Sequence, residues 1–294
     1  MPQCPYCHSP ASEDTQSCPD CGYPLAAGEA VPGEPFMGMI HDRQANPDAA
    51  ACAYQQSPDI DPDDAAKHLI LGNALAREKN LDAARFEYME ALRLDPQCAE
   101  AHFGLGSICY NQLKLDDAER EYKQCLSIDP RNAAAHCNLG ILYQLQCMLV
   151  EAQEEYIEAL RINPDDAFVR YKWGTAYLEA HRSTRKSLYL DAAVKQLEES
   201  LRLNPDSVDT HYDLGDAYRA QGQLDLAVAE YGEVLRLKPG AVDAHRKLGI
   251  VYEAQGKYRQ AVESYRTFIR VAPSQQSWGV RQAEESMRQL EQKM

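Results

Sequence analysis

Residues 99–132 read AEAHFGLGSICYNQLKLDDAEREYKQCLSIDPRN, and residues 133–166 read AAAHCNLGILYQLQCMLVEAQEEYIEALRINPDD. Laid over each other, the two stretches share a Leu-Gly pair, an Ala, a Tyr and a Pro at the same places. A fixed period of this length indicates an array of repeats. The period continues along the chain, because prolines recur at intervals of 34, 34, 34, 41, 34 and 34 residues, at Pro62, Pro96, Pro130, Pro164, Pro205, Pro239 and Pro273.

Each repeat contains two segments of about 12–14 residues with apolar side chains at helical spacing, which predicts two antiparallel helices. Gly and Ala occupy the columns where two helix backbones must approach closely, and Leu and Tyr fill the space left between them. The proline ends each unit because it cannot continue a helix. The sequence therefore predicts an all-α fold of stacked helix hairpins.

This pattern resembles the tetratricopeptide repeat. The resemblance implies a right-handed superhelical solenoid of six helix hairpins over residues 63–274. Beyond it, the apolar spacing of Trp278, Ala283, Met287 and Leu290 on one face predicts an amphipathic capping helix within 276–294. A polar outer face on a terminal helix keeps a repeat stack soluble. The six units are about 65–98, 99–132, 133–166, 167–207, 208–241 and 242–275.

The fourth unit is seven residues longer than the others, and the extra residues fall between Tyr177 and Leu190. We expect either a longer turn between its two helices or one extended helix end. The stretch is basic, with Arg182, Arg185 and Lys186 beside His181. Two interpretations stay open here: a solvated loop, or a contact point for an acidic partner or a phosphate.

The N-terminal segment, residues 1–24, contains two C-x-x-C pairs that resemble a short zinc ribbon. Two such pairs facing each other can form a tetrahedral sulfur site, and so short a segment needs the metal in order to fold. Zinc is the expected ion. Rubredoxin-like iron is the alternative, and it would make the chain a metal-redox or sensor protein. The expected ligands are Cys4, Cys7, Cys18 and Cys21.

Between this ribbon and the repeats, residues 25–62 are rich in Gly, Pro and acidic side chains. They predict a linker with a short helix at 47–56, which we interpret as the remnant of a decayed repeat. The whole chain of 294 residues has a formal net charge of −15. Such acidity argues against nucleic acid and anionic membranes as partners. No stretch predicts a membrane span or a secretory signal, so we expect a cytoplasmic protein.

No catalytic motif occurs in the sequence, so we expect no enzymatic activity. One histidine column invites a metal site, but equivalent residues lie in successive layers of the stack, too far apart to share one ion. Packing between helices is the expected role of these side chains. The column consists of His68, His102, His136, His211 and His245.

The resemblance also implies that the first helix of each repeat lines a concave groove that binds a partner polypeptide. We therefore expect a non-enzymatic adaptor whose ligand is a peptide or helix with apolar anchors and at least one basic residue. Some of the groove aromatics can instead pack between layers. The implied groove residues are Phe103, Tyr110, Ile141, Phe168, Tyr171, Tyr212, Asp216, Arg219 and Arg246.

Overall fold

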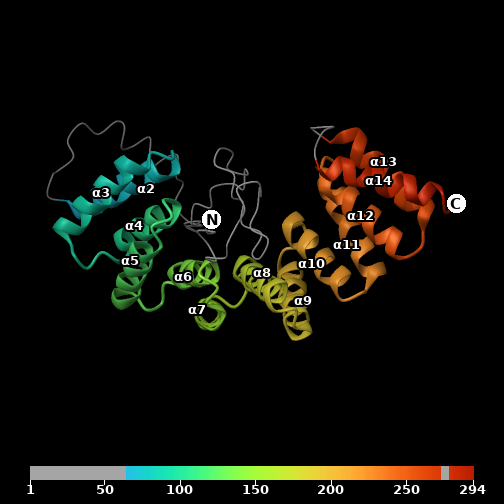
Figure 1. The fold of residues 1–294 in the computed structure, drawn as a ribbon. Coiled ribbons are helices and arrows are strands. Elements are labelled where there is room, and N and C mark those ends of the chain that lie inside the picture. The colour runs from blue at the N-terminus through green and yellow to red at the C-terminus, as the bar shows by residue number, and fades with distance from the viewer. Residues whose placement is uncertain (1–63, 273–277) are drawn as a thin grey trace, which may run out of the picture. The chain divides into compact units, whose positions relative to one another are not determined.

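The computed structural model of the chain describes residues 64–272 and 278–294. These residues form thirteen helices and contain no strand, which confirms the predicted all-helical array (Figure 1). The proposed zinc ligands and the short helix at 47–56 lie outside the described residues. They stay predictions.

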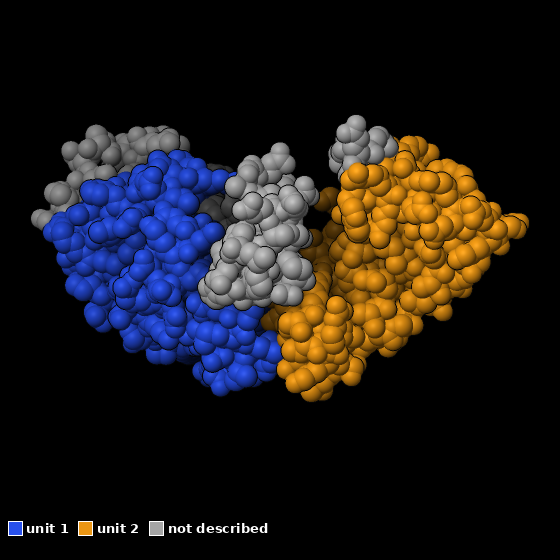
Figure 2. Space-filling view, viewed as in Figure 1, with its two compact units in different colours: residues 1–164 blue, residues 165–294 orange. Residues whose placement is uncertain are grey.

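The helices pair into six antiparallel hairpins, and each hairpin contacts the next one within its compact unit. The chain divides into two such units, an N-terminal unit ending at Pro164 and a C-terminal unit beginning at Asp165 (Figure 2). The N-terminal unit contains α2 (Ala65–Arg77), α3 (Leu81–Leu94), α4 (Ala99–Asn111), α5 (Leu115–Ile128), α6 (Ala133–Leu145) and α7 (Leu149–Ile162).

The C-terminal unit holds three hairpins and one further helix. Its elements are α8 (Ala167–Thr184), α9 (Ser187–Leu203), α10 (Val208–Ala220), α11 (Leu224–Leu237), α12 (Val242–Ala254), α13 (Tyr258–Val271) and α14 (Trp278–Glu291). Short polar residues start several first helices in both units. Asp64, Asn132, Asp166 and Ser207 are N-caps whose side chains accept hydrogen bonds from backbone N–H groups of the first turn.

A glycine against a tyrosine ring holds the two helices of most hairpins together. In the fifth hairpin, Gly215 of α10 faces Tyr231 of α11, and a methyl group on Gly215 would lie only 2.7 Å from the ring. Tyr231 itself is fully buried. The same contact recurs between Gly72 and Tyr88, Gly106 and Tyr122, Gly140 and Tyr156, and Gly249 and Tyr265. The Leu-Gly and Tyr columns of the sequence are thus two sides of one packing contact.

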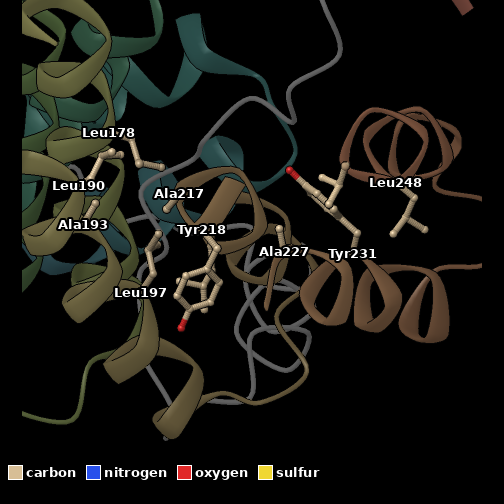
Figure 3. Packing of buried hydrophobic residues seen from close by; sticks show 11 residues of the cluster. Leu178, Leu190, Ala193, Leu197, Ala217, Tyr218, Ala227, Tyr231 and Leu248 are labelled. Atoms are coloured by element: carbon tan, nitrogen blue, oxygen red, sulfur yellow. The ribbon is translucent and has the colours of Figure 1, made fainter. Parts of the chain in front are cut away.

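The fourth hairpin uses leucine instead of tyrosine at this contact, with Leu197 against Gly174. Its seven additional residues lengthen both helices: α8 has 18 residues where the other first helices have 13, and α9 has 17 where the other second helices have 14. Leu178 and Leu190, one on each helix, are buried beside each other near the extended ends (Figure 3). The insertion is therefore regular helix on both sides of a short turn, and the longer-turn interpretation is wrong.

The terminal helix α14 packs on α13 and buries Val280, Ala283 and Leu290. Trp278, which we placed on the same face, is instead 68% exposed. The reason is geometric, because five residues of helix turn the side chain direction by about 140° between positions 278 and 283. Val280 takes the buried place that the sequence analysis gave to Trp278.

We predict that Gly215→Ala destabilises the protein by about 2 kcal/mol, because the new methyl group cannot fit against the ring of Tyr231 without moving it. Gly232→Ala is the matched control. Gly232 lies inside α11 with nothing within 4 Å of an added methyl group, so alanine should stabilise that helix by about 0.5–1 kcal/mol. Urea unfolding of both variants followed by circular dichroism measures the difference, and equal effects would contradict the packing role.

Candidate functional site

The implied groove residues lie on one face of the first helices, at positions 2, 5, 9 and 12 of each repeat. We call this surface the first-helix face. In the N-terminal unit it runs over α2, α4 and α6, where neighbouring first helices contact each other. Phe103 and Ile141 are buried there, and the ring of Phe103 lies 5.9 Å from that of Tyr122. Tyr110 is half-buried. Phe103 therefore packs within its own hairpin, against Tyr122 of α5.

In the C-terminal unit the first-helix face runs over α8, α10 and α12. The structure places Phe168 and Tyr171 on α8, and Tyr212 on the adjacent helix α10, and all three are half-buried. The ammonium group of Lys172 lies 5.3 Å from the centre of the Phe168 ring and 5.4 Å from that of Tyr171. Tyr212 packs edge-on against Tyr231 at 5.8 Å. Aromatic rings and charges are thus interleaved on this part of the face.

Side chains at positions 9 and 12 of the first-helix face accept hydrogen bonds from the hydroxyl groups of the tyrosines that pack against the glycines. Where position 9 is polar, it accepts the hydrogen bond: Tyr88 donates to Asn73 at 2.7 Å, Tyr122 to Ser107 at 3.3 Å and Tyr231 to Asp216 at 2.6 Å. Where position 9 is isoleucine, position 12 accepts instead, from Tyr156 to Gln144 and from Tyr265 to Glu253, each at 2.9 Å. These polar side chains therefore serve the hairpin itself, whatever else they bind.

Asp216 has its carboxylate neutralised within the C-terminal unit. Lys247 of α12 donates to both carboxylate oxygens at 2.7 Å, and Arg219 Nε lies 3.6 Å from one of them. Although burial opposes ionisation, Lys247 keeps the pKa of Asp216 below its ordinary value. Lys247 also lies 5.2 Å from the centre of the Tyr212 ring. This cluster joins the fifth hairpin to the sixth, and the sequence analysis did not include Lys247 in it.

Asp213 is a second carboxylate that the sequence analysis missed. Its Oδ2 accepts a hydrogen bond from the hydroxyl of Tyr171 at 3.0 Å, which links α10 to α8. Burial raises the pKa of Asp213 to about 6, with a further contribution from Asp216 and Asp209, while the Tyr171 hydroxyl and Arg182 act in the opposite direction. Asp213 and Lys247 both occupy position 6 of their repeats, directly after position 5 of the expected face. This adjacency is the feature of the sequence from which they could have been predicted as part of the site.

Arg246 and Asp209 complete the charges of this region. Arg246 Nε donates to Asp243 at 3.1 Å on the same helix, so this guanidinium has an acidic neighbour already. Asp209 is exposed and forms no ion pair with any residue in the described part of the chain. The exposed negative charge on α10 that has no ion-pair partner in the described residues therefore lies at Asp209.

The histidine column pairs with a glutamate column, which the sequence analysis also missed. In four hairpins histidine Nδ1 lies 2.6–2.7 Å from a glutamate Oε2 of the second helix, always 19 residues further along. Burial opposes a charge on His136, yet its contact with Glu155 raises the pKa overall. In residues 64–272 and 278–294, no group of three or more His, Cys, Asp or Glu side chains could hold a metal. The pairs are His68–Glu87, His102–Glu121, His136–Glu155 and His211–Glu230.

Comparison with known protein families gives the same assignment as the geometry. Profiles described as TPR repeat match residues 106–146 and 215–256, and profiles described as tetratricopeptide repeat match residues 37–97, 197–229 and 244–277. Together these ranges cover more than half of the chain. The chain is a tetratricopeptide repeat protein. The match that begins at residue 37 includes the short helix predicted at 47–56.

Solved structures of this repeat protein's fold include PilF of Pseudomonas aeruginosa, with 20% identity and a TM-score of 0.63 over 82% of this chain and 99% of that one. PilW, a type IV pilus biogenesis factor, has 19% identity and a TM-score of 0.65 over 75% of this chain and 98% of that one. YrrB, a TPR protein with an unusual peptide-binding site, has 21% identity and a TM-score of 0.56 over 67% of this chain and 97% of that one. No curated protein matches by sequence. These likenesses show the fold.

Two further properties bear on the class of this repeat protein. None of the helices in the described ranges is both long and apolar enough to cross a membrane. Proteins built from these repeats are typically non-enzymatic adaptors that bind other proteins.

We predict that Asp213→Asn is more stable than the parent protein by about 2 kcal/mol at pH 7. The folded carboxyl group has a pKa of about 6, above its ordinary value, so the folded state binds this proton more tightly than the unfolded state does. Parent stability must then fall as the pH rises from about 4 to about 7, and asparagine, which does not titrate, avoids that loss.

Urea unfolding of both proteins at several pH values tests this sign. The advantage of Asp213→Asn should shrink towards pH 4, where the parent carboxyl group is protonated in the folded state. Asp209→Asn, at an exposed position on the same helix, is the control and should change stability little. A pH-independent difference between Asp213→Asn and the parent would contradict the titration of Asp213.

Proposed function

We propose that this repeat protein is a non-enzymatic scaffold that binds a partner polypeptide on the first-helix face of its C-terminal unit. The carrying observation is the placement of Tyr171 and Tyr212 on adjacent helices, near the exposed carboxylate of Asp209, which forms no ion pair within the described residues. Aromatic side chains are where binding energy concentrates in protein interfaces. A carboxylate near them favours a ligand segment with a basic residue among apolar ones.

Several features support this choice of ligand and of location. Asp216, one of the groove residues implied by the resemblance, already accepts hydrogen bonds from Lys247 and Tyr231 and pairs with Arg219. The basic residue of a ligand therefore has its best partner at Asp209. YrrB, which has the same fold, is a protein with a peptide-binding site. The other groove residues implied by the resemblance remain proposed contacts for a partner, each on the compact unit to which it belongs.

Selection from a displayed random peptide library on the whole protein tests the proposal. We expect enriched peptides to combine aromatic or aliphatic anchors with Lys or Arg. Asp209→Lys should weaken a selected peptide by about tenfold, since it replaces attraction by repulsion on an exposed residue that does not support the fold.

Glu263→Lys makes the same change of charge at an exposed position on the second helix α13, and should leave the affinity unchanged. Calorimetric titration of the three proteins with one selected peptide gives the comparison. Peptides that lack a basic residue, or that respond equally to both substitutions, would count against this face as the binding surface.

We also propose a structural zinc ion at Cys4, Cys7, Cys18 and Cys21. The support is the chemistry of the donor set, because two C-x-x-C pairs supply the four thiolates of a tetrahedral site. The ion would fold the N-terminal segment and leave the repeats as the binding part of the protein.

We predict one zinc ion per chain in purified protein by elemental mass spectrometry. Cys4→Ser combined with Cys18→Ser should abolish it, because each pair then loses a ligand. Cys147→Ser, at an exposed cysteine in the turn between α6 and α7, is the control and should keep the metal. A red preparation containing iron would instead favour the metal-redox or sensor alternative.

A further inference from the structure

The extended fourth hairpin ends in a tip, residues 181–188, that differs in charge from the rest of the protein. Residues 182–188 are all exposed, and no acidic residue occurs from 180 to 190. Arg182, Arg185 and Lys186 form no ion pair with any residue that the structure describes. Three bases without an ion pair thus lie together on a chain whose net charge is −15, and of these Arg182 also lowers the pKa of Asp213 through its charge.

The corresponding turns of the other hairpins lack this concentration of charge. Each of them carries at most one base in its three turn residues, at 78–80, 112–114, 146–148, 221–223 and 255–257. Four of the second helices that follow have an acidic residue in the first turn, whereas α9 has none. Favourable interaction with the α8 dipole accounts for bases in the last turn of that helix. It does not account for Arg185 and Lys186, which lie beyond it.

The tip forms hydrogen bonds of its own. Thr184 Oγ1 donates to the carbonyl of Ala180 at 2.7 Å, and His181 Nδ1 lies 2.9 Å from the carbonyl oxygen of Lys186. Arg185 adopts the left-handed conformation, with φ of 58°. Leu188, at the start of α9, is 70% exposed beside the bases. Basic side chains next to an exposed apolar side chain offer a ligand both charge pairing and apolar contact.

We propose that the hairpin tip is a second docking surface, separate from the first-helix face, that binds an acidic polypeptide segment of a partner protein. The acidic side chains would pair with Arg182, Arg185 and Lys186, and an apolar residue would contact Leu188. Charge complementarity selects this occupant. An extended polyanion such as a nucleic acid or an anionic lipid surface meets the repulsion of the whole acidic chain, whereas a short segment interacts mainly with the local bases.

Fluorescence anisotropy with a labelled peptide of Glu, Leu and Gly tests this proposal on the whole protein. The decisive variant is Arg185→Gly with Lys186→Gln, because glycine accepts the left-handed backbone and both helices keep their ends. We expect this variant to bind the peptide about tenfold more weakly than the parent, and we expect parent binding to weaken as salt is added.

Lys257→Gln with Arg259→Gln is the matched control, since it removes the same charge near another hairpin turn where Lys257 already pairs with Asp225. It should leave binding unchanged. Equal weakening by both double variants would overturn the proposal, because binding would then follow net charge alone. Tighter binding of single-stranded DNA or phosphatidylserine vesicles than of the peptide, with loss in the tip variant, would also overturn the acidic-polypeptide assignment.

Discussion

The close contact between a glycine and a tyrosine ring is the constraint on which every ordinary hairpin of this protein depends. Gly72, Gly106, Gly140, Gly215 and Gly249 each leave room for a ring from the second helix. The ring is then buried, so its hydroxyl group requires a partner, and the first helix supplies one at position 9 or 12. One steric fact thereby fixes helix spacing, the burial of the tyrosines and the polar residues of the first-helix face.

These linked packing requirements explain how much of the fold could be predicted from the sequence. Period, hairpins and the Gly–Tyr columns follow from spacing and size alone, and the structure confirms the all-helical repeat array. The orientation of Trp278 required a count of helical turns, and the structure corrected it. The conformation of the seven additional residues could not be predicted, because composition alone does not determine whether they continue both helices.

The candidate site was harder to predict, because its residues serve two purposes. Asp216 lies where the resemblance places a ligand contact, yet Tyr231, Lys247 and Arg219 use its carboxylate. Asp213 and Lys247 stand one position beyond the expected column, so a rule based on columns passes over them. The charge that remains for a ligand depends on which acidic side chains already have partners, and only the contacts in the folded structure show this.

The fourth hairpin shows how such a protein can gain a new surface while keeping its old one. Its added residues are helical, and the extended ends are anchored by Leu178 and Leu190. The glycine-to-leucine contact at Gly174 lies before the added length on α8 and after it on α9, so the interlock of the two helices is preserved. Hairpin ends in this architecture can therefore grow and diversify independently of the stack, in the way that surface loops do in other folds.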